Sequence, residues 1–469
     1  MIHFIKYFLL IIFLYISNED ENNISRIDDK PNFIFYLSDD QDQLDYKIYG
    51  NDLVESSAVD KLANEGMVFD NFYTAQAICS PSRSQLLTGM YPVKNGCYAN
   101  HIPVKSNISS ITKYLKDVGY EVVLAGKSHV KPNSVFNWSR YFPLMKINNQ
   151  YRYIQLKKIK SYISEAKKPY CLFIASTFPH GPFENDDNFT KKDVVKQPYE
   201  NYIPNFKPAY YSNIKKDNNQ LSEVLKIVDS LDNNNTVFFY ASDHGISGKW
   251  SVNEKGLRAP LVIRWPNKIK SGSKSDALLS YVDIMPTILD IAGARIPNDI
   301  DGKSFTKLFS NNNEQINNYI YGIATKQNVR DAKIFPSRSI RDKQFKYIIN
   351  FNSIEVYKNN FTDNNVINEF IEIGAKAFPD IPYEELYDLS IDPYEKNNIA
   401  TEKKYAKVKS KLNDQLRLWM KSQDDFVDDG IMPIIKPSLH PLDKISKWTK
   451  VPAHLVGKIR ENQYIKSHY

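Results

Sequence analysis

The sequence predicts an α/β fold in which a large, mostly parallel sheet is flanked by helices. Short, unbroken apolar runs alternate with segments of helical periodicity along the first 335 residues. Parallel strands are buried on both faces and are therefore continuously apolar, and their alternation with helices is typical of parallel α/β folds. The chain has 469 residues, 42% hydrophobic and 25% charged, which is a globular composition long enough for more than one domain.

Four apolar runs are the expected strands, and each is followed by polar residues that can carry chemistry. The runs cover residues 32–37, 120–125, 171–175 and 236–241. Helical patterns cover residues 58–65, 111–118 and 221–231. Sites in open parallel sheets form at the carboxyl ends of the strands. Since Asp, Lys and His follow the strands here, we expect the functional site at that edge of the sheet.

A smaller α+β subdomain is expected over residues 336–430, after a catalytic domain at residues 30–335. Residues 339–351 are expected to form a strand pair or one long strand, and residues 383–389 a further strand. An amphipathic helix is expected at residues 403–422, with its apolar side formed by Val408, Leu412, Leu416 and Trp419. The Asn-rich residues 311–318 are expected to form a surface linker, and residues 431–469 are expected to form a C-terminal tail.

The first 17 residues have the pattern of an export signal. Lys6 precedes an apolar run at residues 7–16, and a polar, acidic stretch follows at residues 18–23. The run is shorter than the about 20 residues that span a bilayer, so no stable membrane span is expected. We therefore expect export to a periplasmic, extracellular or endomembrane compartment. Both a cleaved signal peptide and a retained N-terminal anchor remain open, because the small-residue cleavage pattern is weak.

Charge and cysteine content exclude two further classes. Lys and Arg number 61 against 54 Asp and Glu, and the excess is spread along the chain, which argues against a nucleic-acid-binding arm. The excess suits a polyanionic partner and a solvated surface equally well. Three cysteines cannot form a disulfide scaffold. Cys97 and Cys171 are expected to be buried thiols, with a mutual disulfide left open.

The most specific motif runs from Cys79 to Gly89, where Cys-Ser-Pro-Ser-Arg is followed, after three intervening residues, by Leu-Thr-Gly. It closely resembles the signature of the type I sulfatases, and the resemblance extends from residue 32 to about residue 425. It implies an alkaline-phosphatase-like fold. It also implies that a maturation enzyme converts Cys79 to formylglycine, an aldehyde whose hydrate is the nucleophile.

The strand-end residues supply the other groups that sulfate hydrolysis needs, which are a metal, cations and a proton donor. Asp39, Asp40 and Asp243 are hard oxygen ligands, to which His244 can add a contact. Such a set favours Ca²⁺, with Mg²⁺ second, over zinc. His244 stands where the family more often has asparagine. By themselves, the acidic pair and the segment at residues 243–245 are equally consistent with ordinary loops.

The resemblance also implies roles for individual side chains. Modified residue 79 binds the metal and attacks sulfur, while Arg83 and Lys127 hold it or its metal environment. His129 takes a proton as sulfate is released. His180 and Lys249 contact the sulfate, with His180 donating a proton to the leaving group. His101 is expected either to line the substrate pocket or to be an ordinary loop histidine.

Three segments resemble one branch of this family, the sulfamidases, which remove N-linked sulfate from glucosamine in heparan sulfate. These segments are residues 95–101, 126–136 and 385–425. The expected reaction is hydrolysis of a sulfate ester or sulfamate on a sulfated glycan, with N-sulfoglucosamine as the leading substrate. The alternatives are an O-sulfatase of another sulfated polysaccharide, a phosphonate or phosphate-ester hydrolase on the same scaffold, and an inactive glycan-binding relative.

Overall fold

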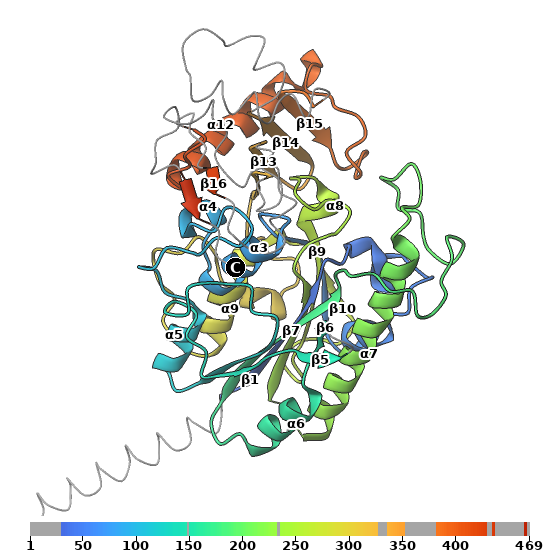
Figure 1. Ribbon diagram of the computed structural model, residues 1–469. Coiled ribbons are helices and arrows are strands. Elements are labelled where there is room, and N and C mark those ends of the chain that lie inside the picture. The colour runs from blue at the N-terminus through green and yellow to red at the C-terminus, as the bar shows by residue number, and fades with distance from the viewer. Residues whose placement is uncertain are drawn as a thin grey trace, which may run out of the picture.

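The computed structural model describes residues 30–147, 150–231, 235–326, 335–351, 381–428, 434–436 and 464–466. The leader expected at residues 1–17, and most of the tail expected at residues 431–469, lie outside the described residues. Two sheets organise the described part of the chain. A large sheet with helices on both faces carries a smaller, C-terminal sheet above one end (Figure 1).

The large sheet has nine strands in the order β10-β2-β9-β8-β1-β7-β3-β4, with β11 also paired to β2. The strands are β1 (Asn32–Asp39), β2 (Met67–Tyr73), β3 (Glu121–Gly126), β4 (Arg140–Phe142), β7 (Tyr170–Pro179), β8 (Thr236–Ser242), β9 (Arg258–Arg264), β10 (Ser273–Ser275) and β11 (Leu279–Ser280). β1 pairs in parallel with β7 and β8, whereas β9 is antiparallel to both of its neighbours. The predicted fold class is confirmed, and the four predicted strands are β1, β3, β7 and β8.

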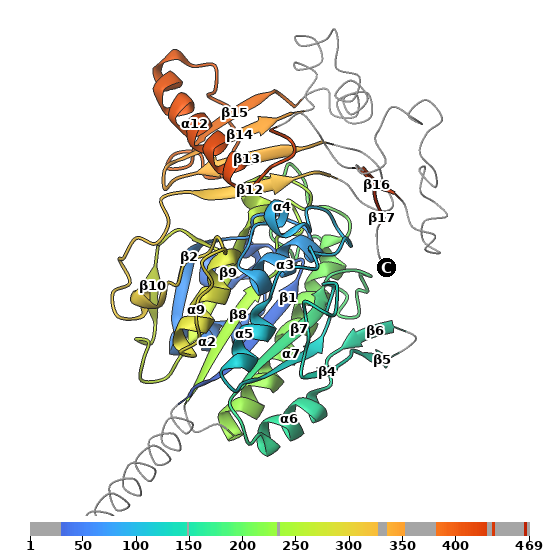
Figure 2. The ribbon, with the colours of Figure 1, turned by 90° about the vertical axis from the view of Figure 1, so that its left-hand side faces the viewer.

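Alternate side chains of each central strand pack against different layers of helices, as the period of two in a strand requires. Ile34 and Tyr36 contribute to the core under α2 (Ser57–Glu65), α6 (Leu156–Glu165) and α7 (Lys207–Leu231). Phe33 and Phe35 contribute to the core under α3 (Cys79–Thr88), α5 (Ile111–Asp117) and α9 (Ile284–Ile291), which face the viewer in Figure 2. The helix predicted at residues 221–231 is the end of the much longer α7.

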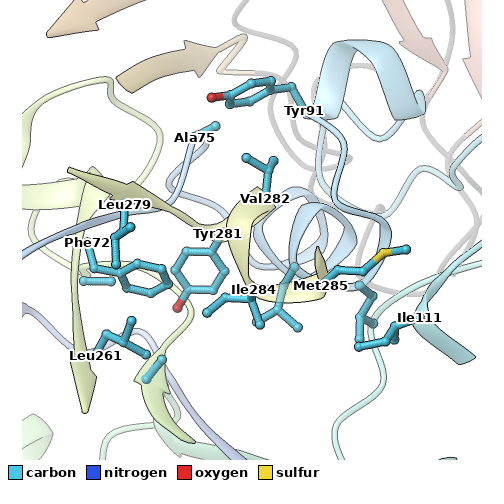
Figure 3. Close-up of a cluster of buried hydrophobic side chains, with 14 of the residues drawn as sticks. Phe72, Ala75, Tyr91, Ile111, Leu261, Leu279, Tyr281, Val282, Ile284 and Met285 are labelled. Carbon is cyan, nitrogen blue, oxygen red and sulfur yellow. The ribbon is translucent and has the colours of Figure 1, made fainter. Parts of the chain in front are cut away.

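The core that contains Phe33 and Phe35 extends to the edge of the sheet where β8 ends. Figure 3 shows Phe72 and Tyr281 side by side, and their rings stack with centroids 4.6 Å apart. The buried Tyr281 hydroxyl donates a hydrogen bond to the carbonyl of Ser242, the last residue of β8. The packed core therefore fixes the backbone at the point where β8 ends.

The smaller sheet is antiparallel, with the order β12-β13-β14-β15. Its strands are β12 (Ile320–Ala324), β13 (Ser337–Arg341), β14 (Phe345–Asn350) and β15 (Glu384–Asp388), and α12 (Ala406–Ser422) packs on β13 and β14. Residues 339–351 thus belong to two strands. β12 joins this sheet although it precedes residue 336, so the sheet starts inside the range expected for the catalytic domain. The Trp419 ring of α12 stacks on Tyr321 with centroids 4.4 Å apart.

The shorter described elements connect these layers. They are α4 (Pro92–Asn95), α8 (Glu254–Leu257), β5 (Met145–Ile147), β6 (Gln150–Tyr153), β16 (Ile434–Lys436), β17 (Tyr464–Lys466) and the 3-10 turns Gln43–Asp45, Lys47–Tyr49, Tyr281–Asp283, Thr306–Phe309 and Lys403–Tyr405. Within the described ranges, the helices are all too short or too polar to cross a membrane. All three cysteines are buried free thiols, so Cys97 and Cys171 are not paired.

Candidate active site

The predicted site residues converge because their strands are neighbours in the large sheet. Asp39 is the last residue of β1, Lys127 follows β3, and His180 follows β7. Asp243 follows β8, and Cys79 is the first residue of α3. Parallel neighbours end at the same edge of a sheet, so residues that are more than 200 positions apart meet there.

Three buried carboxylates form the floor of the site. Asp39, Asp40 and Asp243 are 0%, 3% and 0% exposed, and a ligand oxygen from each lies within 4.8 Å of the others. Asp40 has φ = 66°, and its backbone N–H donates to Asp243 Oδ1 at 2.9 Å. This left-handed turn directs both consecutive aspartates into one site.

The donor set fits a hard divalent cation. Asp39 Oδ1 is fully buried and accepts no hydrogen bond from the described residues, and Arg83 Nη2 approaches it only to 3.4 Å, so the oxygen is free to bind a cation. Three clustered carboxylates offer the oxygen ligands that Ca²⁺ and Mg²⁺ prefer. His244 Nε2 lies 3.1 Å from Asp40 Oδ1, where it borders the same group.

Cys79 lies at the centre of these groups. Its Sγ is 3.5 Å from His244 Nε2, 3.8 Å from Asp40 Oδ1 and 3.9 Å from Lys249 Nζ. Burial raises the pKa of the thiol far above its ordinary value, although Lys127 and Lys249 pull it back in part. An unmodified Cys79 is therefore protonated and is a poor nucleophile, since the thiolate is the reactive form.

Three cations surround the acidic floor. Lys127 Nζ lies 2.5 Å from Asp39 Oδ2, and Lys249 Nζ lies 2.9 and 2.8 Å from the two oxygens of Asp40. Arg83 donates from Nε and Nη2 to Asp243 Oδ2 at 3.2 and 3.1 Å. Burial alone would raise the pKa of Asp40, but Lys249 and His244 lower that pKa to about 2. The carboxylate is consequently ionised at neutral pH.

His180 lies at the rim, with its Nε2 3.6 Å from Asp40 Oδ2 and its side chain 39% exposed. The turn that carries it is clamped from two sides. Arg152 of β6 donates from Nη1 to the Pro182 carbonyl and from Nη2 to the His180 carbonyl, both at 2.6 Å. Asn213 of α7 donates to the carbonyls of Pro179 and Pro182 at 3.3 and 3.1 Å. Neither Arg152 nor Asn213 belongs to a motif, so neither could be predicted from the sequence.

His129 and His101 form a pair beside the central group. His129 Nε2 and His101 Nδ1 are 2.8 Å apart, on loops where both residues have positive φ. No hydrogen bond joins His129 to residue 79 in the described part of the chain. Burial, reinforced by Lys127, lowers the pKa of His129 well below its ordinary value. The imidazole is thus neutral at pH 7.

An ion-pair network ties the Lys249 loop to the smaller sheet. Glu254 Oε2 accepts from Arg341 Nη1 at 2.8 Å, and Glu254 Oε1 accepts from Lys346 Nζ at 3.1 Å. The Glu254 backbone N–H donates to Glu395 Oε2 at 2.7 Å. Within the loop, a Cβ added to Gly256 would lie 2.2 Å from the carbonyl oxygen of Gly248, so a side chain does not fit there. The loop that presents Lys249 is therefore anchored to the smaller sheet.

Two family models match the chain. One, described as Sulfatase, matches residues 31–294. The other, described as N-sulphoglucosamine sulphohydrolase, C-terminal, matches residues 242–371. The first range contains every residue that we assigned to the site from sequence.

Two relatives and one solved structure illustrate the similarity. An ulvan-active sulfatase of Formosa agariphila is 47% identical over 454 residues, covering 95% of this chain and 91% of that protein. The N-sulphoglucosamine sulphohydrolase of Homo sapiens is 25% identical, covering 84% of this chain and 91% of that protein. A structure solved in complex with its substrate, D-glucosamine-2-N,6-O-disulfate, has a TM-score of 0.67 and 20% identity, covering 84% of this chain and 98% of that one.

Proposed function

Because this chain belongs to the sulfatase family, we propose that it hydrolyses sulfate groups on a sulfated glycan, with residue 79 as the nucleophile. The observation that carries the proposal is the position of Cys79, whose Sγ lies within 3.9 Å of both Asp40 and Lys249. A buried residue between an acidic cluster and an ammonium group is suited to an anionic substrate held by a cation.

Two groups complete this proposal. Asp39, Asp40 and Asp243 would hold Ca²⁺ or Mg²⁺, with contacts from His244 and residue 79, and the ion would polarise the sulfate. We infer that a maturation enzyme converts Cys79 to formylglycine, which supplies a hydrated aldehyde for attack on sulfur. The match to the Sulfatase model, whose range contains Cys79 and the motif that follows it, supports this inference.

The chain's own side chains have separate roles in the proposed reaction. Lys249, next to residue 79, binds a sulfate oxygen and stabilises the charge that develops on it. Arg83 and Lys127 fix the acidic floor. His180 is partly exposed at the rim, where the leaving group departs, and donates the proton that this group needs. The neutral His129 accepts a proton from the residue 79 side chain when sulfate is released.

We propose O-sulfate esters of an ulvan-like polysaccharide as the first substrate candidate. The 47% identity to an ulvan-active sulfatase over nearly the whole chain supports it. N-sulfoglucosamine is the second candidate, supported by the C-terminal family model at residues 242–371 and by the 25% identity to the human sulphohydrolase. The leader pattern at residues 1–17 supports export, which would bring the enzyme to a glycan outside the cytoplasm.

Sulfate release from a defined panel tests the proposal. The protein is coexpressed with a formylglycine-generating enzyme, and intact mass reports the state of residue 79. The panel contains ulvan oligosaccharides, N-sulfoglucosamine, glucosamine 6-sulfate, an aryl sulfate and an aryl phosphonate, with Cys79→Ala as the inactive control. Faster turnover of the phosphonate would assign the chain to phosphonate chemistry instead. A residue 79 that stays a thiol, without sulfate release, would indicate a glycan-binding relative.

A further inference from the structure

We propose that the cavity beside His101 and His129 is a binding subsite for a second, anionic sugar of the substrate chain. This inference rests on the proposed function and extends it. The cavity has a volume of about 470 Å³. That volume falls within the about 300–1,000 Å³ that small-molecule sites occupy.

The cavity adjoins the reaction centre. His129, which lines it, is two residues from Lys127, and Lys127 Nζ contacts the buried Asp39. His101, the other imidazole in the lining, is hydrogen-bonded to His129. A glycan whose sulfate lies at residue 79 can therefore place a neighbouring sugar in this cavity.

Two aromatic side chains give the cavity rigid apolar faces. Tyr141 is 49% exposed, yet its hydroxyl donates to the Gly126 carbonyl at 3.1 Å, which fixes the orientation of the ring. Trp138 is half-buried and packs edge-to-face on Phe173, with centroids 5.6 Å apart. Aromatic rings held in this way present contact area at little entropic cost, and the C–H face of a pyranose packs on such a surface.

The polar lining favours an anionic ligand. Lys131 is half-buried in the cavity wall, and its ammonium makes no ion pair with any described residue. Asn133, also in the lining, offers an exposed amide for sugar hydroxyls. None of the described residues that line this cavity is an Asp or Glu. An uncompensated ammonium without a neighbouring carboxylate is complementary to a uronate or to a second sulfate.

The occupant is thus the sugar next to the one that carries the scissile sulfate. The enzyme is expected to prefer oligosaccharides over single sugars and aryl sulfates, because only a longer substrate reaches both positions. Contacts at Lys131 and Tyr141 contribute to binding of the chain and leave the chemistry at residue 79 unchanged.

Two substitutions test the subsite in the mature, full-length enzyme. Lys131→Met and Tyr141→Ala should each lower kcat/KM for a sulfated, uronate-containing tetrasaccharide by about tenfold, which corresponds to about 1.4 kcal/mol. Turnover of 4-nitrophenyl sulfate should change less than about twofold on the same reasoning. The controls are Lys268→Met and Tyr202→Ala, since both side chains are exposed and lie outside the cavity lining.

A carboxyl-reduced form of the tetrasaccharide identifies the anion. If the Lys131→Met effect disappears with this form, Lys131 binds a uronate; if it persists, Lys131 binds a second sulfate. Equal losses on the aryl sulfate and the tetrasaccharide, or no loss on either, would overturn the subsite. If the wild-type enzyme releases no sulfate at all, the proposed function fails instead. In that case, calorimetric titration with the tetrasaccharide still tests the subsite, by comparing the affinity of Cys79→Ser with that of Cys79→Ser combined with Lys131→Met. Weaker binding by the double variant supports the subsite, and equal binding overturns it.

Discussion

The clamp on the His180 turn allows a test of general-acid catalysis that does not alter the imidazole itself. Arg152→Met removes the guanidinium that donates two hydrogen bonds of 2.6 Å to the carbonyls of His180 and Pro182. It keeps an unbranched apolar stem of similar length next to the Phe178 ring, over which the guanidinium lies at 4.3 Å. The longer hydrogen bonds from Asn213 to the same turn remain.

The size of the effect follows from these contacts. Hydrogen bonds from a charged donor contribute about 1.5–3 kcal/mol each, so their loss is enough to let the turn move. A displacement of about 1 Å in a catalytic group lowers the rate by about 100-fold. Proton donation itself contributes about 10²- to 10⁴-fold, and it matters only where the leaving group needs a proton. We therefore expect a loss of up to about 100-fold on substrates with basic leaving groups and little loss on activated ones.

A series of aryl sulfates with leaving groups of increasing pKa measures this difference. The plot of log kcat/KM against leaving-group pKa should become steeper in Arg152→Met, and steeper in the same way in His180→Gln. Lys216→Met is the matched control, because Lys216 Nζ lies 5.9 Å from the centroid of the same Phe178 ring but pairs with Asp186. A uniform loss across the series, or an unchanged slope, would refute the role assigned to Arg152.

Three further predictions concern stability. Asp217 is buried and accepts from the Tyr36 hydroxyl at 2.8 Å, and burial raises its pKa to about 7. The folded state thus holds a proton that the unfolded state releases, so stability falls as pH rises from about 4 through 7. Asp217→Asn should melt like the wild type at pH 4 and be more stable than the wild type at pH 8 by up to about 4 kcal/mol. An equal difference in stability at both pH values would contradict this prediction. Asp425→Asn should destabilise by about 3–5 kcal/mol in urea denaturation, because it leaves the fully buried Arg338, now bound at 2.6 and 2.8 Å, without its counter-charge. Asp428→Asn, which breaks the more exposed pair with Arg417, should lose less than about 1 kcal/mol. Similar losses in the two variants would show that burial does not determine how much an ion pair contributes to stability. Calcium at about 100 times its dissociation constant should stabilise the EDTA-treated protein by about 2.7 kcal/mol; a full shift in Asp39→Asn would place the ion elsewhere.

The central strands were predictable because a strand buried on both faces has to be apolar throughout, as residues 33–37 of β1 are. β9 could not be predicted in this way, because it begins and ends with arginine and contains Pro260, so it lacks the continuous apolar pattern of a buried strand. Its antiparallel direction depends on how the segment around α8 returns to the sheet, which is a tertiary feature. β12 was also not predicted. Its partner β13 is separated from it along the chain by residues outside the described ranges, so this pairing too is a tertiary feature.

The residues of the site also include some that could be predicted from the sequence and some that could not. Side chains that carry reactive groups could be found, because carboxylates, lysines and imidazoles at strand ends form a recognisable chemical set. Arg152 and Asn213 act on backbone carbonyls, and a carbonyl has no sequence identity that could point to its donor. The His101–His129 pair lies between these cases, since both residues were singled out but their contact depends on two loops with left-handed backbone.

The ion pairs around Glu254 have a consequence for how this protein can be shortened or recombined. A chain cut at residue 326 would lack Arg341 and Lys346, and Glu254 would face the protein interior as an acid without either cation. That acid begins α8, five residues after Lys249, so the damage would fall on the loop that presents the ammonium group. The two sheets should therefore function as one unit, and a chimera that replaces either sheet would have to keep that sheet's half of this network.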